Sequence, residues 1–184
     1  MPPLLRVVGF AIVSADGMIA DAAGHMPPSL VNEADQAFFS RALDEADIVV
    51  HGRHSQEPQP QAPRRRRLVL TRRIPALGPH PGNPKALLWN PAGATLEEAC
   101  EAHGVSRGMI AVIGGTDVFG LFLPRYDAFH LTRAEQARLP GGRPVFPGIP
   151  PHTPEELLHR HGLRPGPVRV LDEAAGVSLH TWLR

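Results

Sequence analysis

The segment 110–119 constrains the fold more than any other part of the chain. It consists of a short apolar run, a Gly-Gly pair, and a helix-forming run that opens with Thr116 and Asp117. An apolar run of this length bounded by turn residues predicts a buried strand of an α/β sheet. Glycines that follow a strand and start a helix expose backbone N–H groups, which suit a phosphate group. A simple tight turn explains the same pair of glycines equally well.

Strand and helix patterns alternate along the rest of the chain. Asn32 is placed to cap a helix that runs to about Ala46, and capping boxes begin at Thr95 and Thr153. A further helix is predicted at 117–123 and a loop rich in proline and glutamine at 56–63. Strands are predicted at 5–14, 18–20, 48–52, 68–70, 86–89, 109–113 and 128–132, with a closing hairpin formed by 168–171 and 177–183. We therefore predict one α/β domain: a mostly parallel, twisted central sheet flanked by helices, with a C-terminal antiparallel hairpin.

Composition excludes several classes of protein. The chain of 184 residues is 42% hydrophobic and carries a net charge of +1, so no strong field attracts nucleic acid or an anionic membrane. The apolar run 7–13 is too short to span a membrane and no signal peptide pattern is present, so we expect a cytoplasmic protein. The single cysteine, Cys100, is expected to fill space in the core. No metal site is predicted, because the ten histidines form no metal-binding motif, and no hydrolase nucleophile motif is present.

The sequence Gly52-Arg53-His54-Ser55 follows a predicted strand and repeats the arrangement of the Gly-Gly segment. The planar guanidinium of Arg53 can bind a phosphate with two hydrogen bonds, and the hydroxyl of Ser55 can donate a hydrogen bond to it. A polar surface loop is the alternative interpretation.

Six arginines lie within 64–73, four before a predicted strand and two after Thr71. A solvated basic face, a site for the 2′-phosphate of NADP and a nucleic-acid patch are all compatible with this run. No aromatic residue is interleaved, so single-stranded nucleic acid is disfavoured as a partner.

Asp35 lies in the first turn of a predicted helix, shortly before Phe38 and Phe39. An acid at this position can simply complement the helix dipole. Beside aromatic rings at the rim of a pocket it would instead be partly desolvated, with a raised proton affinity. Such a carboxylate can accept two hydrogen bonds from the edge of an amidine-like heterocycle.

These features, in this order, resemble the dihydrofolate reductase superfamily, which includes the reductase domain of the riboflavin-biosynthesis deaminase-reductase. The opening segment 14–20, His130-Leu131-Thr132 and Phe146-Pro147 also match its pattern. The resemblance implies NADPH as cofactor and Asp35 as the catalytic acid. It implies a substrate site with Phe39, Thr132 and, for a folate carboxylate, Arg65. The cofactor-binding residues it implies are Gly52, Arg53, His54, Ser55, Thr71, Arg72, Ile113, Gly114, Gly115, Thr116, Asp117 and Val118.

Several positions depart from the pattern of either member. Pro28 stands where dihydrofolate reductases usually have tryptophan, and Phe119 where they usually have tyrosine. The segment 176–180 resembles the riboflavin-type enzymes, but their Leu-Thr-x-Arg signature is missing. The resemblance thus implies hydride transfer to a C=N or C=O bond of a small pterin- or pyrimidine-type substrate. A riboflavin-type aminouracil reductase and a non-catalytic nucleotide-binding relative remain alternatives, as do a monomer and a homodimer.

Overall fold

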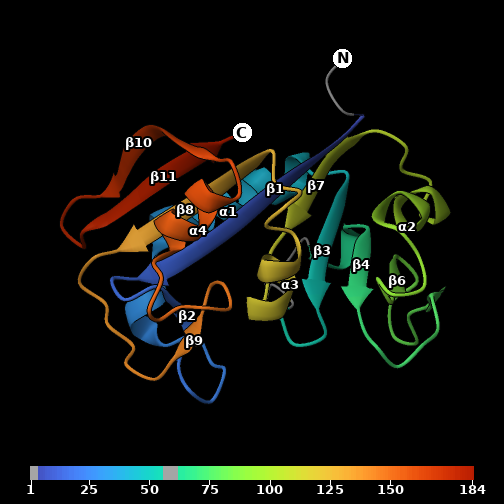
Figure 1. Ribbon diagram of the computed structural model, residues 1–184, viewed down its shortest axis with the longest axis horizontal. Helices are drawn as coiled ribbons and strands as arrows, with labels where there is room; N and C mark the ends of the chain where they lie inside the picture. Colours follow the sequence, from blue (N-terminus) through green and yellow to red (C-terminus); the bar gives the residue numbers. More distant parts are fainter. Residues whose placement is uncertain (1–3, 56–61) are drawn as a thin grey trace.

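The computed structural model describes residues 4–55 and 62–184; most of the loop predicted at 56–63 lies outside the described residues. Among the described residues, nine strands form one sheet in the order β10-β11-β8-β1-β7-β3-β4-β6-β5, and β2 and β9 form a second, small sheet (Figure 1). The strands are β1 (Leu5–Ser14), β2 (Met18–Ala20), β3 (Ile48–Gly52), β4 (Arg67–Leu70), β5 (Leu77–Pro79), β6 (Ala86–Trp89), β7 (Gly108–Val112), β8 (Ala128–Ala134), β9 (Arg143–Pro144), β10 (Arg164–Asp172) and β11 (Val177–Leu183).

The middle of the large sheet is parallel and its two edges are antiparallel. β1 pairs in parallel with both β7 and β8, and β3 pairs in parallel with β7 and β4. β11 runs antiparallel to β8 and β10, and β5 runs antiparallel to β6. The predicted parallel sheet with a closing hairpin is therefore confirmed.

Helices cover both faces of this sheet (Figure 1). The helices are α1 (Glu33–Glu45), α2 (Leu96–Ala102), α3 (Thr116–Leu121) and α4 (Pro154–Arg160), with short 3-10 turns at Pro28–Leu30 and Ala62–Arg64. Side chains of α1 pack with Val8 and Phe10 of β1 in one apolar cluster. Side chains of α2, α3 and α4 pack with Val7 and Val13 in the cluster on the opposite face. Successive side chains of β1 thus pack into apolar cores on opposite faces of the sheet, which explains why its sequence is nearly all apolar.

Polar caps define where the helices begin. The side chain of Asn32 accepts a hydrogen bond from the Asp35 N–H. Thr95 and Thr153 each form the reciprocal capping box predicted from the sequence. Each of these contacts satisfies backbone N–H groups that have no partner inside the helix.

Some elements differ from the prediction. α3 ends at Leu121 rather than residue 123, β8 extends to Ala134, and β10 begins at Arg164. The prolines in β10 are tolerated because the strand lies at the edge of the sheet, where a missing N–H breaks no ladder. The short strands β5 and β9 carry too few residues for a periodic signal and were not predicted. No helix in the described ranges is both long and apolar enough to cross a membrane.

Candidate active site

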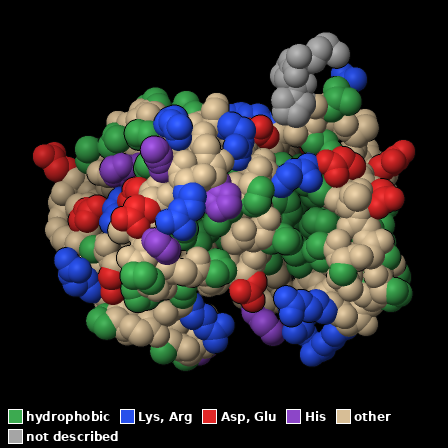
Figure 2. All heavy atoms as spheres, in the orientation of Figure 1, with side chains coloured by type: hydrophobic (Ala, Val, Ile, Leu, Met, Phe, Trp, Pro, Cys, Tyr) green, Lys and Arg blue, Asp and Glu red, His purple; other side chains and the backbone are tan. Residues whose placement is uncertain are grey.

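A large cleft opens where the parallel strands end. Its volume is about 1660 Å³, above the roughly 300–1,000 Å³ typical of a site for one small molecule. It is lined by Ile12, Gly52, Leu70, Ile113 and Thr132, at or near the carboxyl ends of β1, β3, β4, β7 and β8. Open α/β sheets bind their ligands at this edge. Figure 2 shows the hollow along the lower edge of the molecule, with basic side chains beside it.

One half of the cleft is built from the two predicted glycine turns. The Gly52 N–H donates to the Gly114 carbonyl over 2.7 Å, which fixes the turn after β3 against the turn after β7. Gly114 has a φ of +112°, and a Cβ there would lie 2.8 Å from the Phe119 ring. A Cβ on Gly115 would lie 3.1 Å from the Ser55 hydroxyl. Gly114 is therefore required by its backbone conformation and by the Phe119 ring, and a side chain at Gly115 would press on Ser55.

Most of the predicted cofactor residues line this half. The structure brings the following together at the cleft: Gly52, Arg53, His54, Ser55, Thr71, Arg72, Ile113, Gly115, Thr116, Asp117 and Val118. Gly114 is buried directly beneath. Arg73 and Asn90 line the cleft too. Arg73 belongs to the arginine run, so the sequence contains a signal for it. Asn90 belongs to no motif, so the sequence contains no signal for its place in the cleft.

The other half contains the buried carboxyl group of Asp35. Asp35 is only 9% exposed and is hydrogen-bonded through its side chain to Thr132. Burial raises the pKa of Asp35, and the hydrogen bond from Thr132 offsets part of that effect. Phe39 lies one helical turn further along α1 and also lines the cleft. The predicted acid, hydroxyl and ring are thus brought together.

His130 is a cleft residue whose role was not predicted. Its ring stacks on Phe10 at 5.0 Å between centroids, and its Nδ1 lies 3.1 Å from the Thr181 hydroxyl. Burial, with a smaller effect from Arg6, lowers the pKa of His130 to about 4. The imidazole is therefore neutral at pH 7 and can exchange hydrogen bonds without adding charge. Only the pairing of β8 with β1 and β11 reveals this environment.

The structure does not bring Arg65 to the cleft. Its side chain is 7% exposed, and its guanidinium forms an ion pair with Asp44 of α1 at 2.7 Å. Arg67 is buried as well and donates to the Ala62 carbonyl. Side chains in the run 64–67 are alternately exposed and buried as the chain enters β4. The four arginines therefore do not form a uniformly solvated basic face, which was one interpretation of the sequence. Arg65 is therefore not among the residues that line this cleft.

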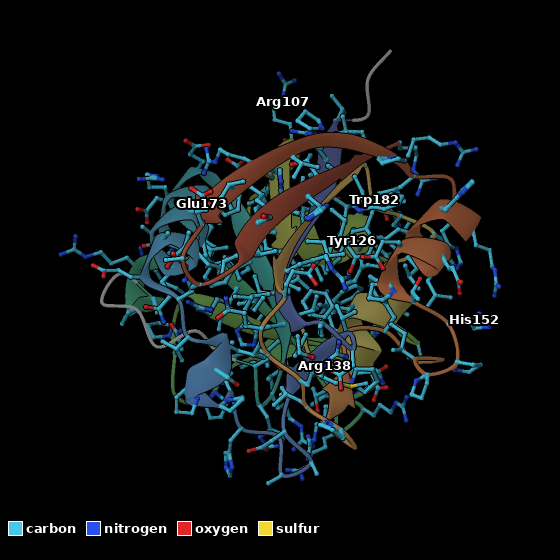
Figure 3. All side chains as sticks on the ribbon, turned by 90° about the vertical axis from the view of Figure 1, so that its left-hand side faces the viewer. Arg107, Tyr126, Arg138, His152, Glu173 and Trp182 are labelled. Atoms are coloured by element: carbon cyan, nitrogen blue, oxygen red, sulfur yellow. The ribbon has the colours of Figure 1, made fainter. Side chains whose placement is uncertain are left out.

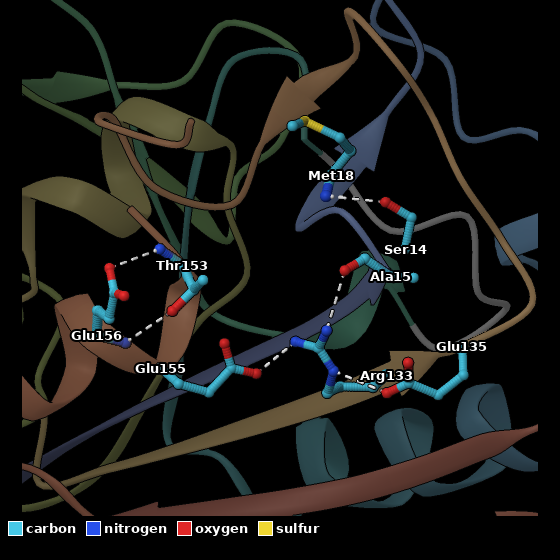
Figure 4. Close-up of polar contacts among 8 residues, drawn as sticks. All are labelled: Ser14, Ala15, Met18, Arg133, Glu135, Thr153, Glu155 and Glu156. Atoms are coloured by element: carbon cyan, nitrogen blue, oxygen red, sulfur yellow. Dashed lines mark hydrogen bonds and ion pairs between the residues drawn. The ribbon is translucent and has the colours of Figure 1, made fainter. Parts of the chain in front are cut away.

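The chain after β1 lines the cleft at Ile19 and Ala20 of β2, and Arg133 of β8 contacts the turn that precedes β2 (Figure 4). Arg133 donates to the Ala15 carbonyl over 3.1 Å and pairs with Glu135 and with Glu155 of α4. The Ser14 hydroxyl accepts from the Met18 N–H over 3.0 Å. These contacts fix where the loop leaves the sheet.

The structure gives no catalytic setting to Cys100 and shows no metal site among the described residues. Burial raises the pKa of the Cys100 thiol to about 12, so the cysteine is an unreactive core residue as predicted. Within the described ranges, no cluster of three or more His, Cys, Asp or Glu side chains is placed to hold a metal ion.

Comparisons with known proteins bear on the fold. No protein-family model matches the sequence, and no curated protein does. Among solved structures, dihydrofolate reductase from Enterococcus faecalis in complex with NADP(H) matches with a TM-score of 0.66 and 19% identity, over 97% of this chain and 96% of that one. This is the dihydrofolate reductase fold.

Two further structures share the dihydrofolate reductase fold. A protein from Shewanella sp. PV-4 described as a riboflavin biosynthesis protein matches with a TM-score of 0.67 and 19% identity, over 97% of this chain and 98% of that one. The deaminase/reductase of Thermotoga maritima matches with a TM-score of 0.67 and 14% identity. That match covers 97% of this chain but 56% of the longer protein.

Proposed function

We propose that this chain is an NADPH-dependent reductase that transfers hydride to a C=N or C=O bond of a pterin- or pyrimidine-type substrate. One observation carries the proposal: a buried carboxyl group, Asp35, shares a cleft with two glycine turns that are hydrogen-bonded to each other. The first feature suits a heterocycle and the second suits a diphosphate.

The residues of the cleft fit the cofactor. Gly52 and Gly115 leave open the space that a Cβ would narrow, and Ser55 adds a hydroxyl beside them. The exposed guanidinium groups of Arg53 and Arg72 can bind phosphate oxygens in pairs. When bound, NADPH would supply the hydride that reduces the substrate.

Asp35 binds and polarises the substrate in this proposal. As a carboxylate it accepts hydrogen bonds from an amino group and a ring N–H on one edge of the heterocycle. This pairing raises the basicity of the neighbouring C=N bond, whose nitrogen then takes up a proton delivered from solvent through a water molecule, and Asp35 stays ionised. Thr132 orients the carboxyl group, and Phe39 packs against the ring.

Apolar side chains of the cleft exclude water from the reacting atoms in this proposal. Ile19 of β2 and Met26 line the cleft, as do Phe10 and Phe39. Closure of apolar side chains over the substrate strengthens the hydrogen bonds of Asp35, because the local dielectric constant falls.

One observation favours a riboflavin-type reductase, acting on 5-amino-6-(5-phosphoribosylamino)uracil, as a second candidate. Arg65, the residue expected to bind a folate carboxylate, is engaged with Asp44. A substrate without a folate carboxylate needs no arginine at this position, so the ion pair between Arg65 and Asp44 does not weaken its binding.

Loss of NADPH absorbance, followed first with dihydrofolate and then with the aminouracil substrate, tests the proposal. NADPH binding is read independently from the fluorescence of Trp89 and Trp182 and from the rise in melting temperature that binding produces. Binding with no turnover on either substrate would identify the chain as a non-catalytic nucleotide-binding relative. Absence of NADPH binding would refute the proposal.

A further inference from the structure

Arg143 lines the cleft but has no part in the function proposed above. It lies on β9, whereas Arg53 and Arg72 follow β3 and β4. In Figure 2 basic side chains flank the hollow on both sides. The cleft therefore has a second cationic wall, formed by a segment far from the first in the sequence.

Backbone contacts fix the position of Arg143. It pairs with Ala20 of β2 in the small sheet. The carbonyl of the next residue, Pro144, accepts a 2.6 Å hydrogen bond from the Thr116 hydroxyl, in the first turn of α3. Arg143 is thereby tied both to the loop that borders the cleft and to the segment that follows Gly115.

The loop makes room for the Arg143 guanidinium at Gly24. A Cβ on Gly24 would lie 2.7 Å from Cζ and 2.9 Å from Nη1 of Arg143. Gly24 has a φ of +88° and donates its N–H to the Asp21 carbonyl over 3.0 Å. The turn at 21–25 thus packs its bare backbone against the guanidinium, which a side chain at 24 would displace.

No acid neutralises Arg143 within the part of the chain that the structure describes. Arg125 and Arg133, by contrast, each pair with glutamates. The carboxylate of Asp21, in the turn that packs on Arg143, accepts hydrogen bonds from the backbone N–H groups of Ala23 and His25. An exposed guanidinium in this position keeps its paired N–H donors for a ligand, and their geometry matches a phosphate group.

We propose that Arg143 binds a phosphate group of the ligand in the cleft and, through Gly24, holds the 21–25 turn over it. The inference rests on the proposed function for the identity of that ligand, whose phosphate belongs either to the diphosphate of the cofactor or to the substrate. Both sources present the same chemistry to the guanidinium.

The test compares Arg143→Gln with Arg107→Gln, which removes the same charge from an exposed arginine outside the cleft. Figure 3 shows Arg107 at the top of the molecule, far from Arg138, which lies in the connection between β8 and β9. Dissociation constants are measured for NADPH, for inorganic pyrophosphate with the free protein, and for ribose 5-phosphate with the NADPH-saturated protein. We expect Arg143→Gln to weaken at least one of these by tenfold or more, and Arg107→Gln to change none by more than twofold.

The arms separate the two sources. Weaker NADPH binding assigns the phosphate to the cofactor, and weaker ribose 5-phosphate binding alone assigns it to the substrate. Arg143→Lys should recover only part of the lost affinity, and Gly24→Ala should reproduce the loss by displacing the guanidinium. One result would separate the two proposals: the protein binds pyrophosphate through Arg143 but does not bind NADPH. That result would refute the proposed function and support this inference. Equal affinities of wild type and Arg143→Gln in all three arms would overturn it, as would a wild type that binds none of the probes.

Discussion

The carboxyl group of Asp35 on α1 is hydrogen-bonded to the side chain of Thr132 on β8. This contact joins the first turn of a helix to the carboxyl end of a parallel strand, inside the cleft. The helix dipole alone would be served by an exposed acid. A buried carboxyl group costs stability, so its position beside a cleft that can hold a ligand argues for a binding role.

Asp35→Asn should lower the turnover number for the reduced substrate by about 100-fold or more, the usual effect of losing a positioned acid–base group. An amide is uncharged and has one acceptor oxygen beside an NH2 donor, so it cannot pair with two N–H groups of the heterocycle as a carboxylate does. NADPH affinity should change by less than about twofold, because the glycine turns lie in the other half of the cleft. Steady-state kinetics and a fluorescence titration check the two values. A variant with unaltered turnover would remove Asp35 from the mechanism.

The same substitution should raise stability at neutral pH. The pKa of Asp35 is raised by folding, so its contribution favours the folded state at low pH and is lost as pH rises through the folded pKa. Asn carries no charge at any pH and escapes this loss. We expect the melting temperature of Asp35→Asn to exceed that of the wild type at pH 7, with the gap narrowing as pH falls toward 3.8. A gap that is independent of pH would contradict the burial of a titrating carboxyl group.

His130 should make the protein sensitive to acid. Its pKa is lowered to about 4, whereas a histidine in an unfolded chain titrates near 6.5. The unfolded chain therefore binds the proton first, and stability falls as pH drops from about 6.5 to about 4, by roughly 3 kcal/mol. His130→Phe keeps the ring against Phe10 and should flatten this part of the curve in urea unfolding at several pH values. Identical slopes for the two proteins would show that His130 is not responsible.

Arg65 should matter for stability and not for substrate. Arg65→Gln removes the ion pair with Asp44 from a side chain that is 7% exposed, and should lower the free energy of unfolding by about 1–3 kcal/mol. KM for any substrate should stay within about twofold, since Arg65 does not line the cleft. Asp44→Ala is the matched control: it breaks the same ion pair but leaves the guanidinium of Arg65 buried, so its loss should be at least as large. A large rise in KM for dihydrofolate alone would return Arg65 to the substrate site.

The elements that the sequence predicts well are those with a local physical signal. β1 is nearly all apolar because it packs into a core on each face, and α2 and α4 begin at capping boxes whose two partners lie three residues apart. The glycine turns are recognisable because a positive φ and the Phe119 ring disfavour a side chain at Gly114, and Ser55 leaves little room for one at Gly115.

The remaining features depend on partners that are distant in the sequence. Arg65 forms an ion pair with Asp44 of α1, 21 residues earlier in the chain. His130 is neutral because strand pairing buries it between Phe10 and Thr181. Neither relationship leaves a pattern along the chain. β9 has two residues and is defined only by its pairing with β2, so the position of Arg143 could not be predicted.

The most direct test of the account is NADPH consumption by the purified protein, with dihydrofolate and with 5-amino-6-(5-phosphoribosylamino)uracil, for wild type and Asp35→Asn side by side. We predict that the wild type oxidises NADPH with at least one of the two substrates and that Asp35→Asn, which still binds NADPH, does so at about one hundredth of the rate or less. No oxidation with either substrate, or equal rates for the two proteins, would contradict the assignment of this cleft as a reductase site built around Asp35.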